Sequence, residues 1–522
     1  MPVTFPSFPH VSRDPLNWIT GEASGLFAQF AAIRRPSDVT TGHLALFNVI
    51  CEPAVDFESL LSSSPNALSF LPPASWTKPL EEGVELEPCN HLLSNGRKPP
   101  DRKDFYARAK ELYCDNEDAF SVLTSVPGLS QPAPCLARFR RFWEGLNSMA
   151  YYWDTTDLAS KDAQANDRDL QAEVEATNVK EPRRKKAKRV TESSPEESPV
   201  PTHHVESIPA HTIHSGVSVP AQTQPPKAPW SSDKPAEPAE RIPGTYRRIR
   251  LGNGAEMPHS FRLNTVGGFL EPIASAFGLM LVPHRHPPTL ALGNIRFPVR
   301  MSAVAWREPA DGMRVRAGWL EGPVMGVQCR PETGFGSTDS LEAESVLDVI
   351  RELGGMLLLS QERAREGKTK KKPGDGKWWV TRPRWGGPEG EVSKERRRVP
   401  AAEAWKLMRS KDGFWDPKVE YQAIGKSSGA VWDEIYMVSS LNHHISILKL
   451  RVHFLYVQFL TDGGLPKDLP KDASWASPTL QRTRWYDFFV IEDRAEAMRG
   501  LWGIMAYLMR QKENVDTTVK DS

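Results

Sequence analysis

Apolar side chains recur every three or four residues in several stretches of the chain, which is the spacing of one face of an α-helix. This spacing predicts helices over 101–113, 135–153, 259–277, 340–365 and 493–509. Asp101 or Asp104 would serve as the N-cap of the first of them. The helix over 135–153 carries phenylalanine and tryptophan on one face, so it must bury that face, against either the helix before it or the C-terminal domain.

Short apolar runs with turn signals between them predict strands in the second half of the chain. These runs are 279–282, 289–292, 295–306, 314–320 and 324–330, followed by a hairpin of 431–440 and 445–452. Connections this short force antiparallel pairing. The fold class predicted is therefore α+β, with an antiparallel sheet and packed helices in a C-terminal domain and a mostly helical N-terminal region.

The composition changes between residues 155 and 241, where proline, serine and threonine are frequent and the only aromatic side chain is Trp230. Such a segment cannot bury enough apolar surface to offset its chain entropy, which predicts a long disordered linker. The chain then divides into parts by composition. They are an N-terminal helical region 1–154, the linker 155–241 with a basic run, a C-terminal α+β domain 242–512 and a disordered tail 513–522. Whether residues 1–100 fold alone or pack on the C-terminal domain stays open.

The basic run in this linker follows Pro182 and is interrupted only by Ala187. It consists of Arg183, Arg184, Lys185, Lys186, Lys188 and Arg189. A run of this charge density in an extended setting suits the acidic groove of a nuclear import receptor. The alternative is a solvated charge run in a linker. The first interpretation predicts a nuclear protein, with the cytoplasm as the alternative location.

A second basic stretch, over 367–398, mixes cations with aromatic side chains. Its candidate contacts are Lys370, Lys371, Lys372, Trp378, Trp379, Arg382 and Arg384. Cations suit phosphates and flat rings suit unstacked bases, so the stretch is a candidate contact for single-stranded nucleic acid. The alternative is a short core strand near Trp378 and Trp379, joined by solvated loops.

Patterns that would indicate catalysis or a metal are incomplete. Gly425–Gly429 matches G-x-S-x-G, but the parallel sheet and downstream histidine of that motif are missing, which favours a turn. His443 and His444 would point to opposite faces of a strand unless they lie in a turn, and no third ligand has metal spacing. We therefore expect no catalytic residue, no cofactor and no metal site.

An enzyme with an unrecognised site is an alternative, and it would gain support if the fold gathered one set of polar residues in a pocket. These residues are His284, His286, Asp311 and Arg330.

Net charge, cysteine spacing and the lengths of the apolar runs narrow the class of protein. The net charge is +1, so affinity for nucleic acid must come from local patches. The five cysteines are widely spaced without a C-x-x-C pair, which is typical of a reducing compartment. The first residues lack the layout of a secretory signal, and no apolar run approaches the ~20 residues of a membrane helix. We expect an intracellular protein without membrane contact.

Two segments, Phe139–Asp154 and Arg482–Arg510, resemble segments of uncharacterised proteins of filamentous fungi. The resemblance implies no activity and no catalytic residue, and it favours an intracellular location. The sequence as a whole predicts a non-enzymatic, nuclear, protein-interaction protein with an unknown protein partner. Nucleic-acid binding through 367–398 and an enzyme with an unrecognised site are the alternatives.

Overall fold

The structure is a computed structural model. It describes residues 18–34, 38–79, 92–123, 134–152, 254, 256–284, 288–316, 319–330, 342–366, 421–426, 430–466 and 468–511. Met1–Asp154 and Ile242–Ser522 form one compact unit. A second unit, Thr155–Arg241, lies outside the described residues. The N-terminal helices therefore pack with the C-terminal strands. This answers the question of whether the first hundred residues fold alone or pack on the C-terminal domain.

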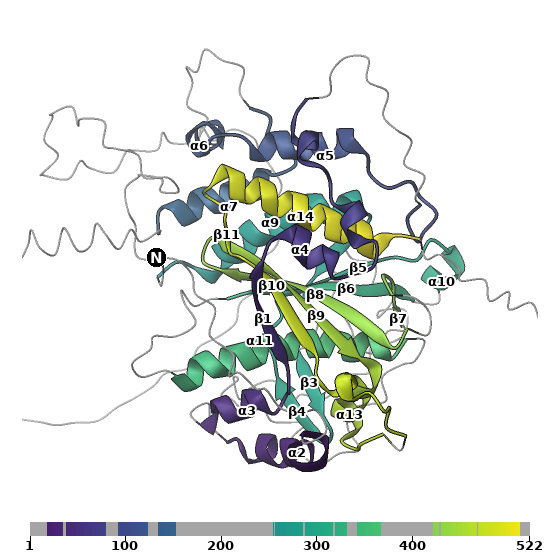
Figure 1. The fold of residues 1–522 in the computed structure, drawn as a ribbon. Coiled ribbons are helices and arrows are strands. Elements are labelled where there is room, and N and C mark those ends of the chain that lie inside the picture. Colours follow the sequence, from purple (N-terminus) through teal and green to yellow (C-terminus); the bar gives the residue numbers. More distant parts are fainter. Residues whose placement is uncertain are drawn as a thin grey trace, which may run out of the picture. The chain divides into compact units, whose positions relative to one another are not determined.

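A nine-stranded sheet is the centre of the compact unit (Figure 1). Its strands are β1 (Ile50–Val55), β2 (Met280–Val282), β5 (Ala303–Arg307), β6 (Leu320–Cys329), β7 (Tyr421–Gln422), β8 (Trp432–Leu441), β9 (His444–His453), β10 (Thr479–Thr483) and β11 (Tyr486–Asp487). The order is β1-β10-β9-β8-β6-β5-β2, with β11 paired to β9 and β7 paired to β6. A small separate sheet pairs β3 (Thr289–Leu292) with β4 (Ile295–Pro298).

Most neighbouring strands are antiparallel, including β8 and β9, which a short turn joins, but the sheet is mixed. β6 is parallel to β7 and β8, and β1 is parallel to β10. Each parallel pair joins strands that are distant in the sequence, so turn signals could not reveal these pairings. Helix α11 (Glu342–Ala364) lies between β6 and β8 in the chain, and the three form a parallel crossover unit.

The other helices come from both halves of the chain. They are α2 (Ala23–Ala32), α3 (Thr41–Ala45), α4 (Phe57–Ser62), α5 (Arg102–Leu112), α6 (Asn116–Leu123), α7 (Arg140–Ala150), α9 (His259–Ala276), α10 (Gly312–Arg316), α13 (Phe454–Asp462) and α14 (Ile491–Met509), with the short turns η1 (Trp18–Glu22), η3 (Ala67–Phe70), η4 (Ala74–Thr77) and η6 (Ala473–Ala476). The Asp101 side chain caps α5, as predicted, by accepting from the Asp104 amide. Among these helices, as far as they are described, none has the length and apolar character of a membrane span.

Helices cover both faces of the sheet (Figure 1). Helices α4, α5, α6, α7, α9 and α14 share one hydrophobic core, and α2, α3, α11 and α13 share the other with β3 and β4. Strand β8 is buried on both sides, because Tyr436 and Val438 enter the first core while Ile435 and Met437 enter the second. A strand with two covered faces reads as a continuous apolar run.

The predicted fold class is confirmed, since helices pack with a sheet, and the predicted hairpin matches β8 and β9. Two strand predictions were wrong. Residues 314–320 were expected to form a strand, but 314–316 belong to α10 and β6 begins only at Leu320. Asp311 initiates the helical turn, because its Oδ1 accepts from the Met313 amide at 2.8 Å. The range 295–306 divides at Pro298 into β4 and β5, which belong to different sheets.

Candidate functional sites

Both basic stretches that the sequence singled out lie outside the described residues. This applies to Arg183, Arg184, Lys185, Lys186, Lys188 and Arg189, and to Lys370, Lys371, Lys372, Trp378, Trp379, Arg382 and Arg384. Nuclear import and nucleic-acid contact through these residues stay predictions.

The residues proposed for an unrecognised enzyme pocket have separate surroundings. The Arg330 guanidinium is buried and pairs with Asp348 at 3.2 Å and with Glu352. Asp311 is exposed and faces Arg314, and His284 Nε2 lies 3.4 Å from the Met301 sulfur. His286 lies outside the described residues. The three described residues are thus engaged in different local contacts, which does not favour a shared pocket.

The tip of the β8–β9 hairpin brings two histidines together. Asn442 has φ 54°, the left-handed conformation that asparagine tolerates in turns. His443 lies in the turn and His444 begins β9, so the two rings are not forced onto opposite faces. Their ring centroids are 4.1 Å apart. The condition under which both histidines can bind one ion, a position in a turn, is therefore met.

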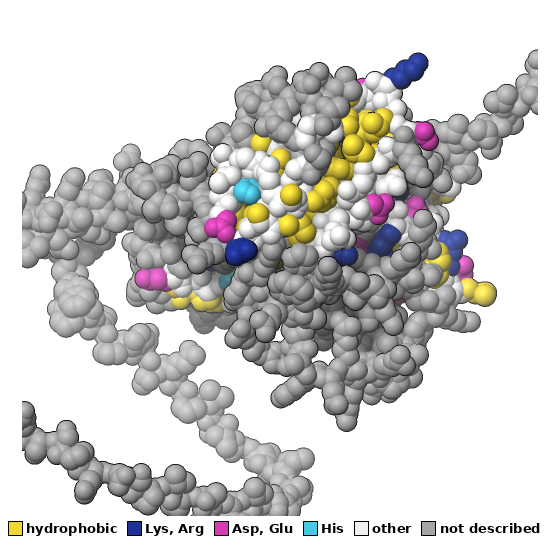
Figure 2. All heavy atoms as spheres, turned by 90° about the horizontal axis from the view of Figure 1, so that it is seen from below, with side chains coloured by type: hydrophobic (Ala, Val, Ile, Leu, Met, Phe, Trp, Pro, Cys, Tyr) yellow, Lys and Arg dark blue, Asp and Glu magenta, His cyan; other side chains and the backbone are white. Residues whose placement is uncertain are grey.

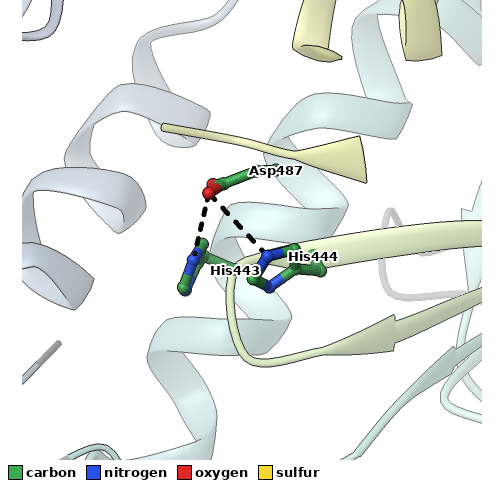
Figure 3. Close-up of side chains that lie close together, drawn as sticks. All are labelled: His443, His444 and Asp487. Carbon is green, nitrogen blue, oxygen red and sulfur yellow. Dashed lines mark ion pairs between the residues drawn. The ribbon is translucent and has the colours of Figure 1, made fainter. Parts of the chain in front are cut away.

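A carboxylate from a later strand completes this cluster. Asp487, on β11, is paired in register with His444 of β9. Its Oδ2 lies 3.4 Å from His443 Nε2 and 3.8 Å from His444 Nε2. Figure 3 shows both rings directed towards this carboxylate. All three ligand atoms lie within 4.8 Å of one another.

Main-chain bonds hold the cluster in place. Asp487 Oδ1 accepts from the Phe489 amide at 2.8 Å, which leaves Oδ2 directed at the histidines. The Phe488 amide donates to the His443 carbonyl at 3.0 Å, so the hairpin tip and the turn after β11 are joined directly. The Phe489 ring packs edge-on against His443 at 5.0 Å.

Two members of the cluster have shifted pKa values. Burial and the neighbouring His443 lower the pKa of His444 to about 3, so its imidazole is neutral at physiological pH. Burial alone would raise the pKa of the Asp487 carboxyl, but the charge that the histidines carry when protonated, a hydrogen bond from His443 and the Phe489 amide outweigh burial and hold that pKa below its usual value. A neutral imidazole and an ionised carboxylate are the protonation states in which these groups bind metals.

A second polar cluster lies inside the fold, around Lys449 of β9. Its Nζ lies 3.2 Å from Glu434 Oε1 and also donates to Ser63 and Ser64. A serine beside a lysine can form a nucleophile–base pair. Here Ser64 is 3% exposed and its hydroxyl donates to Glu434 at 2.7 Å, so a substrate cannot reach it. The cluster supplies the buried Lys449 ammonium with a charge partner and hydrogen-bond acceptors, which is a structural role.

A groove of about 490 Å³ lies between the C-terminal part of α11, the start of β8 and α13. Val431 and Phe454 line it and are each 47% exposed. The two residues are neighbours, since the Phe454 amide donates to the Val431 carbonyl at 2.9 Å. Lys426 and Asp462 also line the groove, so charges of both signs lie beside the apolar side chains.

Two hydroxyl groups and one carboxyl group that line this groove are bonded within the fold. Ser360 donates to the Leu357 carbonyl at 2.6 Å, and Thr461 donates to the Val457 carbonyl at 2.7 Å. Asp433 forms a two-pronged pair with Arg363, at 2.8 and 2.9 Å. These three groups are held in structural bonds, so the groove is better suited to binding than to bond chemistry.

No family model, curated protein or solved structure matches this chain. The resemblance of two segments to fungal proteins therefore stays a prediction, and the candidate sites rest on their own geometry.

Sequence reasoning identified His443 and His444 but not the third member of their cluster. Asp487 lies on the two-residue strand β11, which is too short for any periodicity to show. The groove was also missed, because α11, β8 and α13 meet there only through the tertiary fold.

Proposed function

We propose that this protein acts in the nucleus by binding a partner protein, and that the groove beside α13 is its binding surface. The observation that supports it most directly is the combination of half-exposed Phe454 and Val431 with polar groups that are bonded within the fold. Exposed apolar side chains with a polar rim are the usual anatomy of a protein–protein interface. Apolar side chains also form a stripe on the face of the unit seen from below, the side of α2, α3 and α13 (Figure 2).

The chemistry of the groove indicates what the partner presents. An apolar side chain would cover Phe454 and Val431, and an acidic group next to it would face Lys426 on the rim. We therefore propose that the partner is a polypeptide segment with an apolar anchor flanked by an acidic residue. The basic run 183–189 supports the nuclear part of the proposal, through an import receptor that binds it in extended form.

Phe454→Asp should remove partner binding without unfolding the protein. Phe454 is the first residue of α13, and an acidic residue in the first turn is favourable for a helix. Loss of a central anchor costs about 2 kcal/mol or more, which is roughly 30-fold in affinity. The measurement is affinity capture of the tagged full-length chain from cells, followed by titration of each identified partner against the purified variants.

Met313→Asp is the matched control, because Met313 is 76% exposed and does not line the groove. A partner that is lost with Phe454→Asp but retained with Met313→Asp supports the groove. Equal binding of every identified partner by both variants would overturn it.

Changing the basic residues of 183–189 to alanine should move a fluorescent fusion of the full-length chain from the nucleus to the cytoplasm. The control fusion carries Lys370, Lys371 and Lys372 as alanines, which removes another basic run of the same chain. Live-cell imaging gives the ratio of nuclear to cytoplasmic fluorescence. If the 183–189 variant distributes like the unchanged fusion, the nuclear proposal fails.

A further inference from the structure

We infer that His443, His444 and Asp487 form a binding site for one divalent transition-metal ion of the zinc class. This site goes beyond the proposed partner binding and does not depend on it. The ligand set comes from three places in the chain that the fold brings together: the hairpin turn, the start of β9 and the strand β11.

The distances fit a small metal ion. Bonds of about 2.1 Å to nitrogen and oxygen in a tetrahedral site place neighbouring ligand atoms about 3.4 Å apart. The separation of 3.4 Å between His443 Nε2 and Asp487 Oδ2 equals this value. The separation of 3.8 Å for His444 Nε2 exceeds it by a few tenths of an ångström, which a small ring rotation can close. All three ligand atoms lie within 4.8 Å of one another, which bounds the separation of the two histidine nitrogens.

The ligand types select the class of metal. Two imidazoles with one carboxylate suit zinc and other first-row divalent ions, whereas calcium and magnesium prefer oxygen ligands. Three protein ligands leave a coordination position for water or for another donor. The Phe489 amide bond to Asp487 Oδ1 is the kind of outer contact that fixes a ligating carboxylate.

An ion can reach the site from solvent. The side chain of His443 is 1% exposed, but those of His444 and Asp487 are 14% and 19% exposed. A bound ion would join the β8–β9 hairpin to the turn that leads into α14, and so stabilise the edge of the sheet where β11 pairs with β9. A simple carboxylate–imidazole ion pair is the competing explanation for the cluster, and it requires no ion.

The inference is tested by titrating zinc into the metal-stripped full-length protein and measuring the heat of binding by calorimetry. We expect one Zn²⁺ per chain and an increased melting temperature, because a ligand of the folded state stabilises it. Co²⁺ should bind at the same stoichiometry and show the visible absorption of a low-coordinate site. Millimolar Mg²⁺ should not displace either ion.

Asp487→Asn and His444→Gln approximately keep the size of the side chains. Loss of a residue that only hydrogen-bonds a metal ligand weakens metal binding roughly 10- to 100-fold, so loss of a ligand itself should weaken Zn²⁺ binding by more than that. His453→Asn is the control, since this β9 histidine lies outside the cluster and asparagine can replace it as the cap of α13. Circular dichroism of each variant verifies that it folds. Absence of stoichiometric Zn²⁺ binding in the unchanged protein, or unchanged binding in both cluster variants, would overturn the inference.

Discussion

Gly268→Ala is expected to destabilise the compact unit by about 3 kcal/mol. Gly268 lies on α9, where a Cβ atom would be 2.4 Å from the Phe142 amide nitrogen and 2.8 Å from the Arg141 carbonyl carbon of α7. Both neighbours are backbone atoms, so no side chain can rotate away. The crossing is close from the other side as well, because a Cβ on Gly145 would be 2.4 Å from Thr265 Oγ1. The two helices must separate to admit a methyl group.

The adjacent glycine of the same helix provides the control. A Cβ on Gly267 would meet nothing nearer than 3.7 Å, at the end of the Arg141 side chain and at Glu271. Alanine favours a helix over glycine by up to about 1 kcal/mol, so Gly267→Ala should leave stability unchanged or raise it. Denaturant unfolding of both variants measures the difference. Similar stability changes in the two variants would contradict the close crossing of α7 and α9.

The crossing of α7 and α9 also helps to explain why the parts of the chain before and after 155–241 fold as one unit. Helix α7 precedes the segment 155–241 and α9 follows it, yet Phe142 and Phe269 belong to one core. Their ring centroids lie 5.4 Å apart. The sequence predicted the apolar face of the α7 region and offered the preceding helix or the C-terminal domain as its partner, but it could not choose between them or identify α9. Helical periodicity reports which side of a helix is buried, and it carries no information on what covers it.

The parts of the fold that the sequence predicted are those that depend on local patterns. The helix α9 and the hairpin of β8 and β9 have strong periodicity and clear turn residues, and both lie where expected. The parallel pairing of β6 with β8 depends on strands that are far apart in the chain. At α10 a local pattern was misleading, because the alternation in 314–320 satisfied a strand template while Asp311 supplied the hydrogen bond that starts a helical turn.

The candidate sites also divide into those visible as local sequence patterns and those that only the tertiary fold assembles. The run 183–189 stays a prediction, and it could be made from the sequence because an import receptor would bind such a run in extended form, without a fold. The histidine cluster could be predicted only in part, because adjacent histidines are visible in the sequence and their turn was anticipated. Asp487 reaches them through the pairing of β11 with β9, which no local signal announces.

Arg494→Met is expected to destabilise the unit by about 4 kcal/mol or more, because several buried acceptors would lose their donor. Arg494 is fully buried on α14, and burial lowers the pKa of its guanidinium to about 10, so it is charged at neutral pH. It donates to the carbonyls of Leu112 at 2.6 Å, of Phe488 at 3.1 Å and of Cys114. The Leu112 carbonyl belongs to the last turn of α5, where helical acceptors have no partner within the helix.

The guanidinium therefore connects three segments that meet at one point: the end of α5, the turn after β11 and the start of α14. It also lies 4.7 Å from the centre of the Trp143 ring, which places it against α7. Methionine fills a similar volume but donates no hydrogen bond. Lysine at this position should recover only part of the stability, since one ammonium cannot reproduce the planar fork of donors.

Arg140→Met is the control for this prediction, since Arg140 is exposed on α7 and pairs with Glu144 one turn away. An exposed pair of this kind contributes little, so the control should change stability by less than about 0.5 kcal/mol. Denaturant unfolding compares the three variants with the unchanged chain. Zinc titration of Arg494→Met adds a second readout, because Phe488 follows Asp487 directly and the loosened turn should weaken metal binding. An Arg494→Met variant as stable as Arg140→Met would show that these carbonyls do not depend on Arg494.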